Sequence, residues 1–320
     1  MRYIVRRLAH AILLLIAISV FSFVLLQWTP GNYFDALRLD PRVSAQTIEG
    51  LRSQFGANQS FAARYIHWGR SLLSGDMGYS FSYDAPVAPL LWSRAKNTLL
   101  LAGIATLLAW MIAIPAGIWS AASKGGPSDR LFGAGTSTLL AIPDLVLFLI
   151  LLMIAVRTGR FPTGGMVSNS FGSLSGWGKA KDIASHFVLP AAGLAIVMLP
   201  MLVRHIRSAM VETLESPFIR AARAHGIPRL RVLLRYALPA ASNPLISLLG
   251  FSIATILSGS AVLEIIMSWP GLGPLMVQAV LSRDVYVVAG IVMLSSVFLV
   301  AGNLFADVLL VLSDPRIRAE

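Results

Sequence analysis

The chain of 320 residues contains no cysteine, and only 13% of its residues are charged. Without cysteine the protein has no disulfide bond, no thiol nucleophile and no thiolate metal site. The phosphate-binding pattern GxxxxGK(S/T), the zinc-protease pattern HExxH and the hydrolase pattern GxSxG are also absent. These absences predict a chain that hydrolyses no ATP, holds no cofactor or metal and is not an enzyme by itself. A membrane-embedded hydrolase is the alternative from a different class, and hydrolytic activity of the purified chain would reveal it.

Apolar residues are abundant, because 56% of the chain is hydrophobic. A soluble domain, in contrast, usually carries about 25% charged residues. Uncharged runs of about 20 residues are long enough to cross a bilayer as helices. The sequence therefore predicts an all-α membrane protein with a single transmembrane domain over 1–320. Six spans are expected, at 8–28, 97–119, 131–156, 187–210, 240–263 and 285–312.

The net charge of +11 has two interpretations, binding to nucleic acid or control of membrane topology. Basic residues in short loops usually mark the cytoplasmic side of a membrane. Three arginines precede the first span and seven lie in 204–239, whereas the basic residues at 157–181 oppose this bias. We therefore expect both termini in the cytoplasm and no nucleic-acid partner. The first span is interpreted as an uncleaved anchor rather than a signal peptide, because its apolar run is long.

The external loop between the first two spans, 29–96, is expected to be folded. Ser44 and Gly56 predict the start and the end of a first helix, and "GDMGYS" at 75–80 predicts a turn. A second helix between them would carry an aromatic and apolar stripe, made of Phe61, Tyr65, Trp68 and Leu72. This stripe either packs the loop onto the spans or forms a docking surface for an extracytoplasmic partner.

The cytoplasmic loop 211–239 is strongly basic, because "FIRAARAHGIPRLRVLLRYALP" at 218–239 contains five arginines and no acid. Ser216 and Pro217 predict a helix start, and Gly226 predicts its end. One face of this helix is small or apolar and the arginines lie off it: the face holds Phe218, Ala221, Ala222 and His225, and Arg220 and Arg223 lie beside it.

A second helix is expected to begin at Pro228, with an apolar stripe of Leu230, Leu233 and Leu234. The first, basic helix has two interpretations. It fits a groove on another protein, because small side chains permit a close approach. It equally fits a membrane interface, where arginines meet anionic lipid headgroups.

The same segment resembles the cytoplasmic loop of permease subunits of ATP-binding-cassette importers. In that family a Glu-Ala-Ala triplet is followed by a glycine and, further on, by an isoleucine and a Leu-Pro pair. The matching residues here are Ala221, Ala222, Gly226, Leu238 and Pro239. Arg220 replaces the glutamate and Tyr236 replaces the isoleucine, and an arginine before the alanines resembles the peptide/nickel branch. The resemblance implies a coupling helix at 217–226 that seats in the ATPase through Phe218, Arg220, Ala221, Ala222, Arg223 and Gly226.

Further stretches match this branch in the same order, namely "MRYIVRRL", "GDMGYS", "PVAPLLWSRAKNTLLLA", 264–284 and 303–318. Together they resemble the first of the two permease subunits of dipeptide, oligopeptide, glutathione or nickel importers in bacterial inner membranes. The implied partners are a homologous second permease, two ATPase subunits that hold ATP and Mg, an extracytoplasmic substrate-binding protein and the lipid bilayer. The implied mechanism is alternating access. We favour peptides over nickel as cargo, because the spans lack a cluster of metal ligands, and nickel or glutathione is the alternative cargo.

Asp144 follows Pro143 in the middle of the third expected span. A carboxylate at that depth is costly and is by default a candidate functional residue. Its alternative role is a buried acid paired with a polar group on another span. Ser247, Thr255 and Ser258 lie on one broad face of the fifth expected span, where they either line the pathway or mediate helix packing.

The stretch "SWPGLGPL" at 268–275 predicts a turn followed by a short helix. Tryptophan suits a membrane interface, and the resemblance places this stretch near the external mouth. Its residues are candidates for an external gate, namely Trp269, Pro270, Gly271 and Gly273. The alternative is a structural cap on a re-entrant segment. Asn303 and Asp307, one turn apart near the last span's cytoplasmic end, are interpreted as structural contacts.

Overall fold

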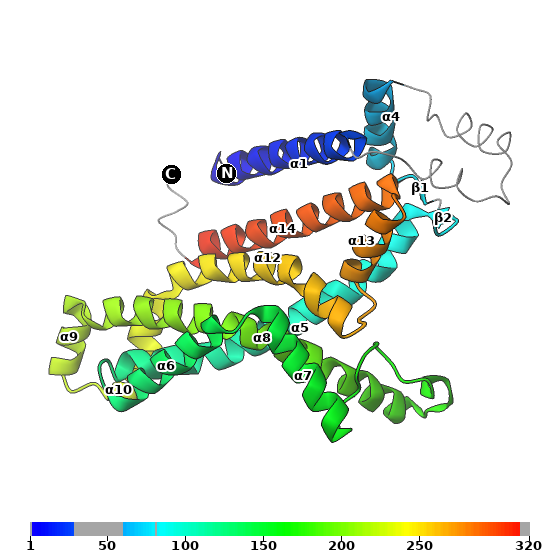
Figure 1. The fold of residues 1–320 in the computed structure, drawn as a ribbon. Coiled ribbons are helices and arrows are strands. Elements are labelled where there is room, and N and C mark those ends of the chain that lie inside the picture. The colour runs from blue at the N-terminus through cyan, green and yellow to red at the C-terminus, as the bar shows by residue number, and fades with distance from the viewer. Residues whose placement is uncertain (1, 29–59, 81, 314–320) are drawn as a thin grey trace, which may run out of the picture. The chain divides into compact units, whose positions relative to one another are not determined.

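The computed structural model describes residues 2–28, 60–80 and 82–313 (Figure 1). The helix expected between Ser44 and Gly56 lies outside these residues. Within the described residues the chain is largely helical, and its one sheet pairs β1 (Tyr79–Ser80) with β2 (Ala85–Pro86) in antiparallel register.

Five long helices follow the apolar runs of the sequence: α1 (Arg2–Trp28), α5 (Val87–Ala122), α8 (Gly176–Leu214), α12 (Ser242–Ile266) and α14 (Val285–Ser313). Of these, α1, α5, α8 and α14 are each long and apolar enough to cross a membrane. Two bent pairs raise the number of candidate spans to six. At ~1.5 Å per residue, the 39 residues of α8 are longer than a bilayer core of about 30 Å requires.

The chain forms two compact units, one of 1–7, 99–269 and 299–320 and the other of 8–98 and 270–298. In the first unit, α8 is the central element and packs against α6 (Pro127–Ala141), α7 (Asp144–Thr158) and α12. Leu202 and Ile206 of α8 are fully buried there. Gly117 of α5 faces Ile206 so closely that a Cβ atom would lie 2.7 Å from it, which explains why this position carries no side chain.

The second unit contains α4 (Phe61–Leu73) and α13 (Leu272–Leu281). Trp68 of α4 is buried and its ring lies 5.5 Å from the ring of Phe23 on α1. The Tyr65 hydroxyl lies 2.8 Å from the Ser19 hydroxyl. Tyr65 and Trp68 of the expected stripe therefore pack α4 onto α1, which favours the packing interpretation over the docking surface.

The hairpin that follows α4 is anchored by a buried carboxylate. Asp284 accepts hydrogen bonds from Ser80 Oγ at 2.7 Å and from the Ser82 backbone N–H at 3.3 Å. Before the hairpin, Gly75 and Gly78 have φ values of +83° and +95°, which a residue with a Cβ rarely adopts. The turn predicted at 75–80 is thus present and leads into β1.

The third expected span is not one helix. α6 ends at Ala141, α7 begins at Asp144, and the two helices meet at 96°. Ile142 takes an extended conformation with ψ 120°, because a residue before proline is pushed out of the helical region and Pro143 itself cannot donate a backbone hydrogen bond. Each half has 15 residues, or roughly 22 Å at ~1.5 Å per residue. The span predicted at 131–156 is therefore two helices with a sharp bend between them rather than one continuous helix.

The fifth expected span also has a bend at its start. The segment Arg229–Ala240 meets Ser242–Ile253 at 65°, and α12 then continues to Ile266. Within the first unit, α12 lies very close to α14, because a Cβ atom on Gly250 would come within 2.5 Å of the Ala306 side chain. This glycine permits the two helices to cross in contact.

Candidate functional site

The predicted helix of the basic loop is present as α9 (Pro217–Ala224), at the left edge of Figure 1. Ser216 is extended, but its hydroxyl donates to the Thr213 carbonyl at 2.6 Å instead of capping α9. Gly226 has φ +73°, the left-handed conformation that commonly ends a helix. The Ile227 N–H donates to the Ala222 carbonyl at 3.3 Å and the Gly226 N–H to the Arg223 carbonyl at 3.0 Å, which is a Schellman motif.

The buried face of α9 differs from the one expected. Ile219 is 0% and Ala222 is 7% exposed, and α9 packs against α8 and the following segment. Because positions three apart share a helix face, these two residues anchor α9 to the protein. Ala222 was predicted on the free face and belongs instead to the anchor. The exposed residues of α9 and its C-cap are Pro217, Phe218, Arg220, Ala221, Arg223, Ala224 and His225.

The segment after α9 also differs from the prediction. It consists of α10 (Arg229–Arg231), the π-helical η2 (Val232–Ala237) and α11 (Leu238–Ala240). A π-helix bonds residues five apart, so Val232 and Ala237 share its buried face. Leu230 and Leu234 are 67% and 48% exposed. The predicted stripe of three leucines is therefore wrong, because it assumed the period of an α-helix.

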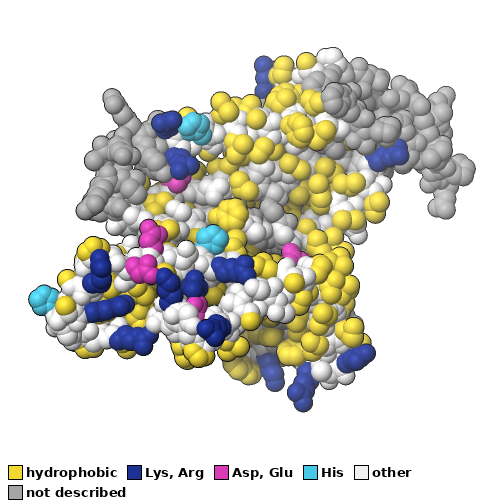
Figure 2. Space-filling model, turned by 60° about the vertical axis from the view of Figure 1, so that its left-hand side comes forward, with side chains coloured by type: hydrophobic (Ala, Val, Ile, Leu, Met, Phe, Trp, Pro, Cys, Tyr) yellow, Lys and Arg dark blue, Asp and Glu magenta, His cyan; other side chains and the backbone are white. Residues whose placement is uncertain are grey.

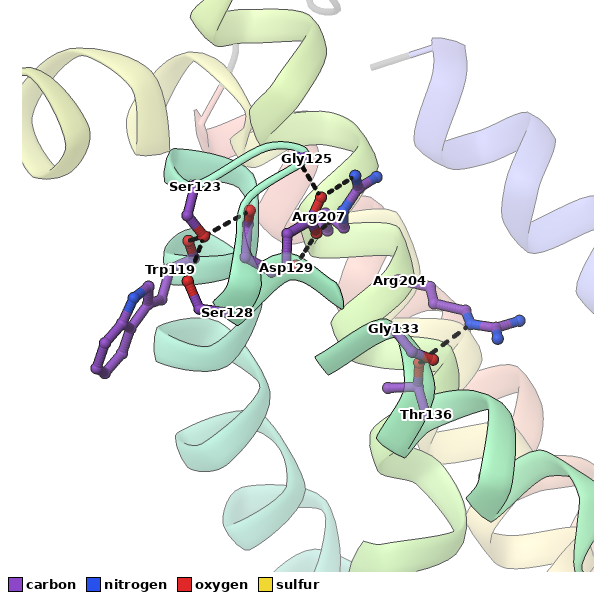
Figure 3. Close-up of polar contacts among 10 residues, drawn as sticks. Trp119, Ser123, Gly125, Ser128, Asp129, Gly133, Thr136, Arg204 and Arg207 are labelled. Atoms are coloured by element: carbon purple, nitrogen blue, oxygen red, sulfur yellow. Dashed lines mark hydrogen bonds and ion pairs between the residues drawn. The ribbon is translucent and has the colours of Figure 1, made fainter. Parts of the chain in front are cut away.

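Below the basic loop, an ion pair joins α6 to α8 (Figure 3). Arg207 donates from Nε to Asp129 Oδ1 at 2.6 Å and from Nη2 to Asp129 Oδ2 at 2.7 Å. Ser120 Oγ donates to the same carboxylate at 2.6 Å and the Gly125 N–H at 2.8 Å. Such bidentate, charge-assisted hydrogen bonds are the strong ones in proteins. They fix the turn between α5 and α6 against α8.

Three more polar contacts surround this ion pair. Arg204 donates to Ser137 Oγ at 2.8 Å, Lys124 pairs with Glu215, and Arg229 donates to the Ala122 carbonyl. The hydrogen bond from Lys124 and its positive charge lower the pKa of the exposed Glu215 carboxyl. The loop that carries α9 is thus tied to the end of α5 and to the turn that follows α5. Figure 2 shows several Lys and Arg side chains exposed together over the end of this unit that carries α9.

Asp129, Lys124 and Glu215 were missed at the level of sequence, and Arg207 was counted only as a topological charge. A signal was present, because Asp129 lies in the first turn of α6 after Pro127, where acidic residues interact favourably with the helix dipole. Its partner Arg207 lies 78 residues further along the chain. No local pattern identifies such a pair.

The candidate pathway residues lie on two elements of the first unit. Asp144 begins α7 and is exposed, and it forms no hydrogen bond or ion pair within the described part of the chain. Whether it faces the pathway or pairs with a polar group on another span stays a prediction. Ser247 and Thr255 are exposed on α12, and their hydroxyls donate to the carbonyls of Asn243 and Phe251. The side chain of Ser258 lies outside the described residues.

The candidate gate residues are buried. Trp269 is 0% exposed, and its ring packs edge-on against Phe187 at 4.5 Å in the first unit. The membrane-interface position expected for this tryptophan stays a prediction, and its ring is buried within the protein. In the second unit, Gly271 and Gly273 are buried and Pro270 is half-buried; the Pro270 carbonyl accepts from Asn97 Nδ2 at 2.8 Å. This burial favours the structural cap over a side chain that lines an open path.

Within the described residues, no group of three or more His, Cys, Asp or Glu side chains could hold a metal ion. The described ion pair of Arg7 and Asp307, at 3.3 Å, joins the start of α1 to α14 within the first unit. It agrees with the structural role predicted for Asp307. The candidate functional site is the exposed basic helix α9, which is supported by helices joined through ion pairs and hydrogen bonds.

Long apolar helices joined by such a loop define the class of polytopic membrane permeases. The chain belongs to the family of binding-protein-dependent transport system inner membrane components, whose model matches residues 113–319. Residues 1–102 match the model of the N-terminal part of such membrane components. The chain is thus a permease component of an ATP-binding-cassette importer, as the sequence resemblance implied.

Two curated relatives match over nearly their whole length. The oligopeptide transport system permease protein AppB of Bacillus subtilis (strain 168) is 37% identical over 318 residues, which cover 99% of each chain. The dipeptide transport system permease protein DppB of Escherichia coli (strain K12) is 30% identical over 335 residues, again 99% of each chain. Among solved structures, a chain of the inward-facing MetNI methionine ABC transporter has a TM-score of 0.58 at 18% identity, covering 70% of this chain and 96% of that one. This likeness shows the fold alone.

Proposed function

We propose that this chain forms half of the translocation pathway of a peptide importer and that α9 couples it to the ATPase subunits. The names of the two curated relatives, an oligopeptide and a dipeptide permease, favour peptides over nickel or glutathione. The other half of the pathway is a homologous second permease. Two ATPase subunits hold ATP and Mg, and an extracytoplasmic protein delivers the cargo.

The observation that carries the coupling role is the division of α9 into two faces by adjacent alanines. Ala222 is buried with Ile219, and the Schellman motif at Gly226 fixes the end of the helix. Ala221 is exposed beside Phe218. A short helix held rigidly from beneath, with a small residue and an aromatic ring on its free side, is suited to enter a groove of a partner. Because it is held rigidly, α9 can also pass a displacement by the partner on to the helices that support it.

The two alanines give a matched experiment. Ala221→Trp adds a bulky ring to the free face, so the ATPase subunits should be lost from the purified complex while the thermal stability of the chain is unchanged. Ala222→Trp overpacks the anchor, which typically costs about 1–3 kcal/mol, so the chain itself should unfold at a lower temperature. Normal ATPase retention and normal cargo-stimulated ATP hydrolysis in Ala221→Trp would contradict the coupling role.

Two further parts of the chain support a role in the pathway. Asp144 and the α12 face of Ser247 and Thr255 are exposed in the single chain, and exposed polar groups on apolar helices need water or a partner. We infer that they face the second permease or the path between the two. The burial of the stretch from Trp269 to Gly273 favours a structural cap, whose removal would loosen the external end. A gating role for this stretch is therefore our second hypothesis.

The same proposal includes orientation. If six spans alternate, α9 and both termini lie on one side, and the arginine bias puts that side in the cytoplasm. ATP is available there, which is what a helix that couples to ATPases requires.

A further inference from the structure

A hollow opens beside α9, between the end of α5 and the segment that follows α9. Its volume is about 320 Å³. Its lining belongs entirely to the first unit and consists of Ala122, Arg223, Ile227, Arg229, Val232 and Leu233.

The lining combines positive charge with an apolar floor. Arg223 and Arg229 are exposed, whereas Val232 is buried and Ile227 and Leu233 are half-buried. No acidic side chain lines the hollow. Arg229 donates to the Ala122 carbonyl, but a guanidinium has five N–H groups, so it keeps donors for a further acceptor.

We propose that this hollow receives an aspartate or glutamate side chain of the ATPase subunit that docks on α9. This inference rests on the proposed coupling role and adds the chemistry of the partner to it. The planar guanidinium matches a carboxylate, with two parallel hydrogen bonds, and the methylene groups of the acid would lie on Ile227 and Leu233. The two proteins would then interlock, because α9 inserts into a groove of the ATPase subunit and the hollow receives an acidic side chain of that subunit.

An interlocking contact of this kind explains the position of the two arginines. Arg223 is in the last turn of α9 and Arg229 is in the first turn after it, so the Schellman turn at Gly226 brings two positive charges to one concave site. Positive charges that converge on a hollow favour binding of an anion. Because the exposed face of Phe218 and Ala221 beside the hollow is proposed to contact a protein, we infer that the anion is a side chain of that protein. An anionic lipid headgroup is the competing source of the same charge, and the experiment separates the two.

The chain offers a matched control. Arg223→Gln removes a charge from the hollow, whereas Arg220→Gln removes an equally exposed charge of α9 that does not line it. The complete importer is purified and reconstituted into phosphatidylcholine nanodiscs that contain no anionic lipid. ATPase retention is then measured as the protein is diluted. We expect Arg223→Gln to weaken retention at least about tenfold, because tenfold corresponds to ~1.4 kcal/mol and truncating one partner of a hydrogen-bonded, buried interfacial charge pair costs more than that. Arg220→Gln should weaken retention less than about threefold.

Each other outcome overturns the proposal. Wild-type retention in Arg223→Gln would show that the hollow is not used, and equal losses in both variants would show a diffuse basic surface. A loss that occurs only when phosphatidylglycerol is added would assign the hollow to a lipid headgroup. Ala221→Trp is measured in parallel. If it loses the ATPase while Arg223→Gln does not, the hollow fails and the coupling role stands; if neither does, the coupling role itself fails.

A second measurement does not depend on affinity. The chain has no native cysteine, so Ile227→Cys can carry a photoactivatable thiol reagent inside the hollow, and Leu230→Cys can carry it on an exposed position outside the hollow. The reagent at position 227 should cross-link to the ATPase at an acid-bearing peptide, and the one at 230 should do so much less. Cross-linking from position 227 only to lipid would overturn the assignment.

Discussion

At the scale of single residues, Asp129 holds the support of the coupling loop together. Its carboxylate accepts four hydrogen bonds, two from Arg207 and one each from Ser120 and Gly125. The Asp129 side chain is 9% exposed and that of Arg207 is 36% exposed. The acid is thus buried while Arg207 keeps contact with solvent, so solvent partly screens the attraction between the two charges. Losing the ion pair destabilises the chain mainly because the buried Asp129 carboxylate loses its hydrogen bonds.

We predict that Asp129→Asn destabilises the chain by about 2 kcal/mol, below the ~3–5 kcal/mol for removing one partner of a fully buried pair. The amide nitrogen of asparagine would present donors to the donors of Arg207. Thermal unfolding of the purified chain in detergent measures the effect. Ser137→Ala, which removes one exposed hydrogen bond of Arg204, is the control and should change stability by less than about 1 kcal/mol.

The double variant Asp129→Asn with Arg207→Gln tests the origin of that loss. It removes the unpaired charge, so part of the stability should return, and the two substitutions should be non-additive as expected for residues in contact. Additive losses in this cycle would mean that the ion pair contributes nothing beyond its separate side chains.

Asp144 leads to the second prediction at this scale. It is an exposed carboxylate at the break of an apolar span, and asparagine preserves its size without its charge. If it faces the cargo path, Asp144→Asn should reduce uptake of cationic peptides several-fold more than uptake of neutral ones. Competition between a lysine-containing and an alanine-containing dipeptide in intact cells measures this ratio. An unchanged ratio at equal membrane abundance would remove Asp144 from the path.

At the scale of elements, the end of α9 depends on backbone conformation alone. Apart from Gly226 itself and its two chain neighbours, no residue has an atom within 4 Å of the position that a Cβ atom would occupy on Gly226, yet its φ is +73°. A side chain there meets no clash, so its effect comes from the left-handed backbone, which costs an ordinary residue about 1–2 kcal/mol. Asparagine tolerates this conformation better than a β-branched residue.

We therefore predict that Gly226→Val displaces the end of α9 and impairs cargo-stimulated ATP hydrolysis of the assembled importer, whereas Gly226→Asn keeps most of it. Because neither substitution lies within a span, membrane abundance should stay normal in both. Equal activity of the two variants would show that the left-handed turn is not needed for coupling.

The elements also show how far the sequence leads. Proline at the start and glycine after the end identified α9 to within a residue or two, because capping chemistry is local. The face that α9 buries could not be found in the same way, since alanines at 221 and 222 look alike until the neighbours of the helix are known. The π-helical turn at 232–237 was not predicted, because the pattern of apolar residues does not indicate a change from the α-helical to the π-helical period. The Asp129–Arg207 pair escaped because its partners meet only in the folded chain.

At the scale of the whole molecule, the absence of cysteine makes topology measurable. Single substitutions Ser60→Cys and Ala224→Cys place thiols at exposed positions, the first in the loop proposed to be external and the second in the loop proposed to be cytoplasmic. In intact cells a membrane-impermeant maleimide should label the first and not the second, and permeabilised cells should show both. Labelling of Ala224→Cys from outside would reverse the proposed orientation and remove α9 from the side where ATP is found.

The break between α6 and α7 has a consequence for the life of the protein in the cell. Counted as one span, this pair puts an unwound turn and the Asp144 carboxylate at a depth where lipid offers no hydrogen bonds. A chain made in excess of its partners would keep this unwound turn and the Asp144 carboxylate exposed to the hydrocarbon of the bilayer. Membrane proteases that sense such defects should therefore remove unassembled copies, so the amount of this permease would be set by the supply of its partner rather than by its own synthesis.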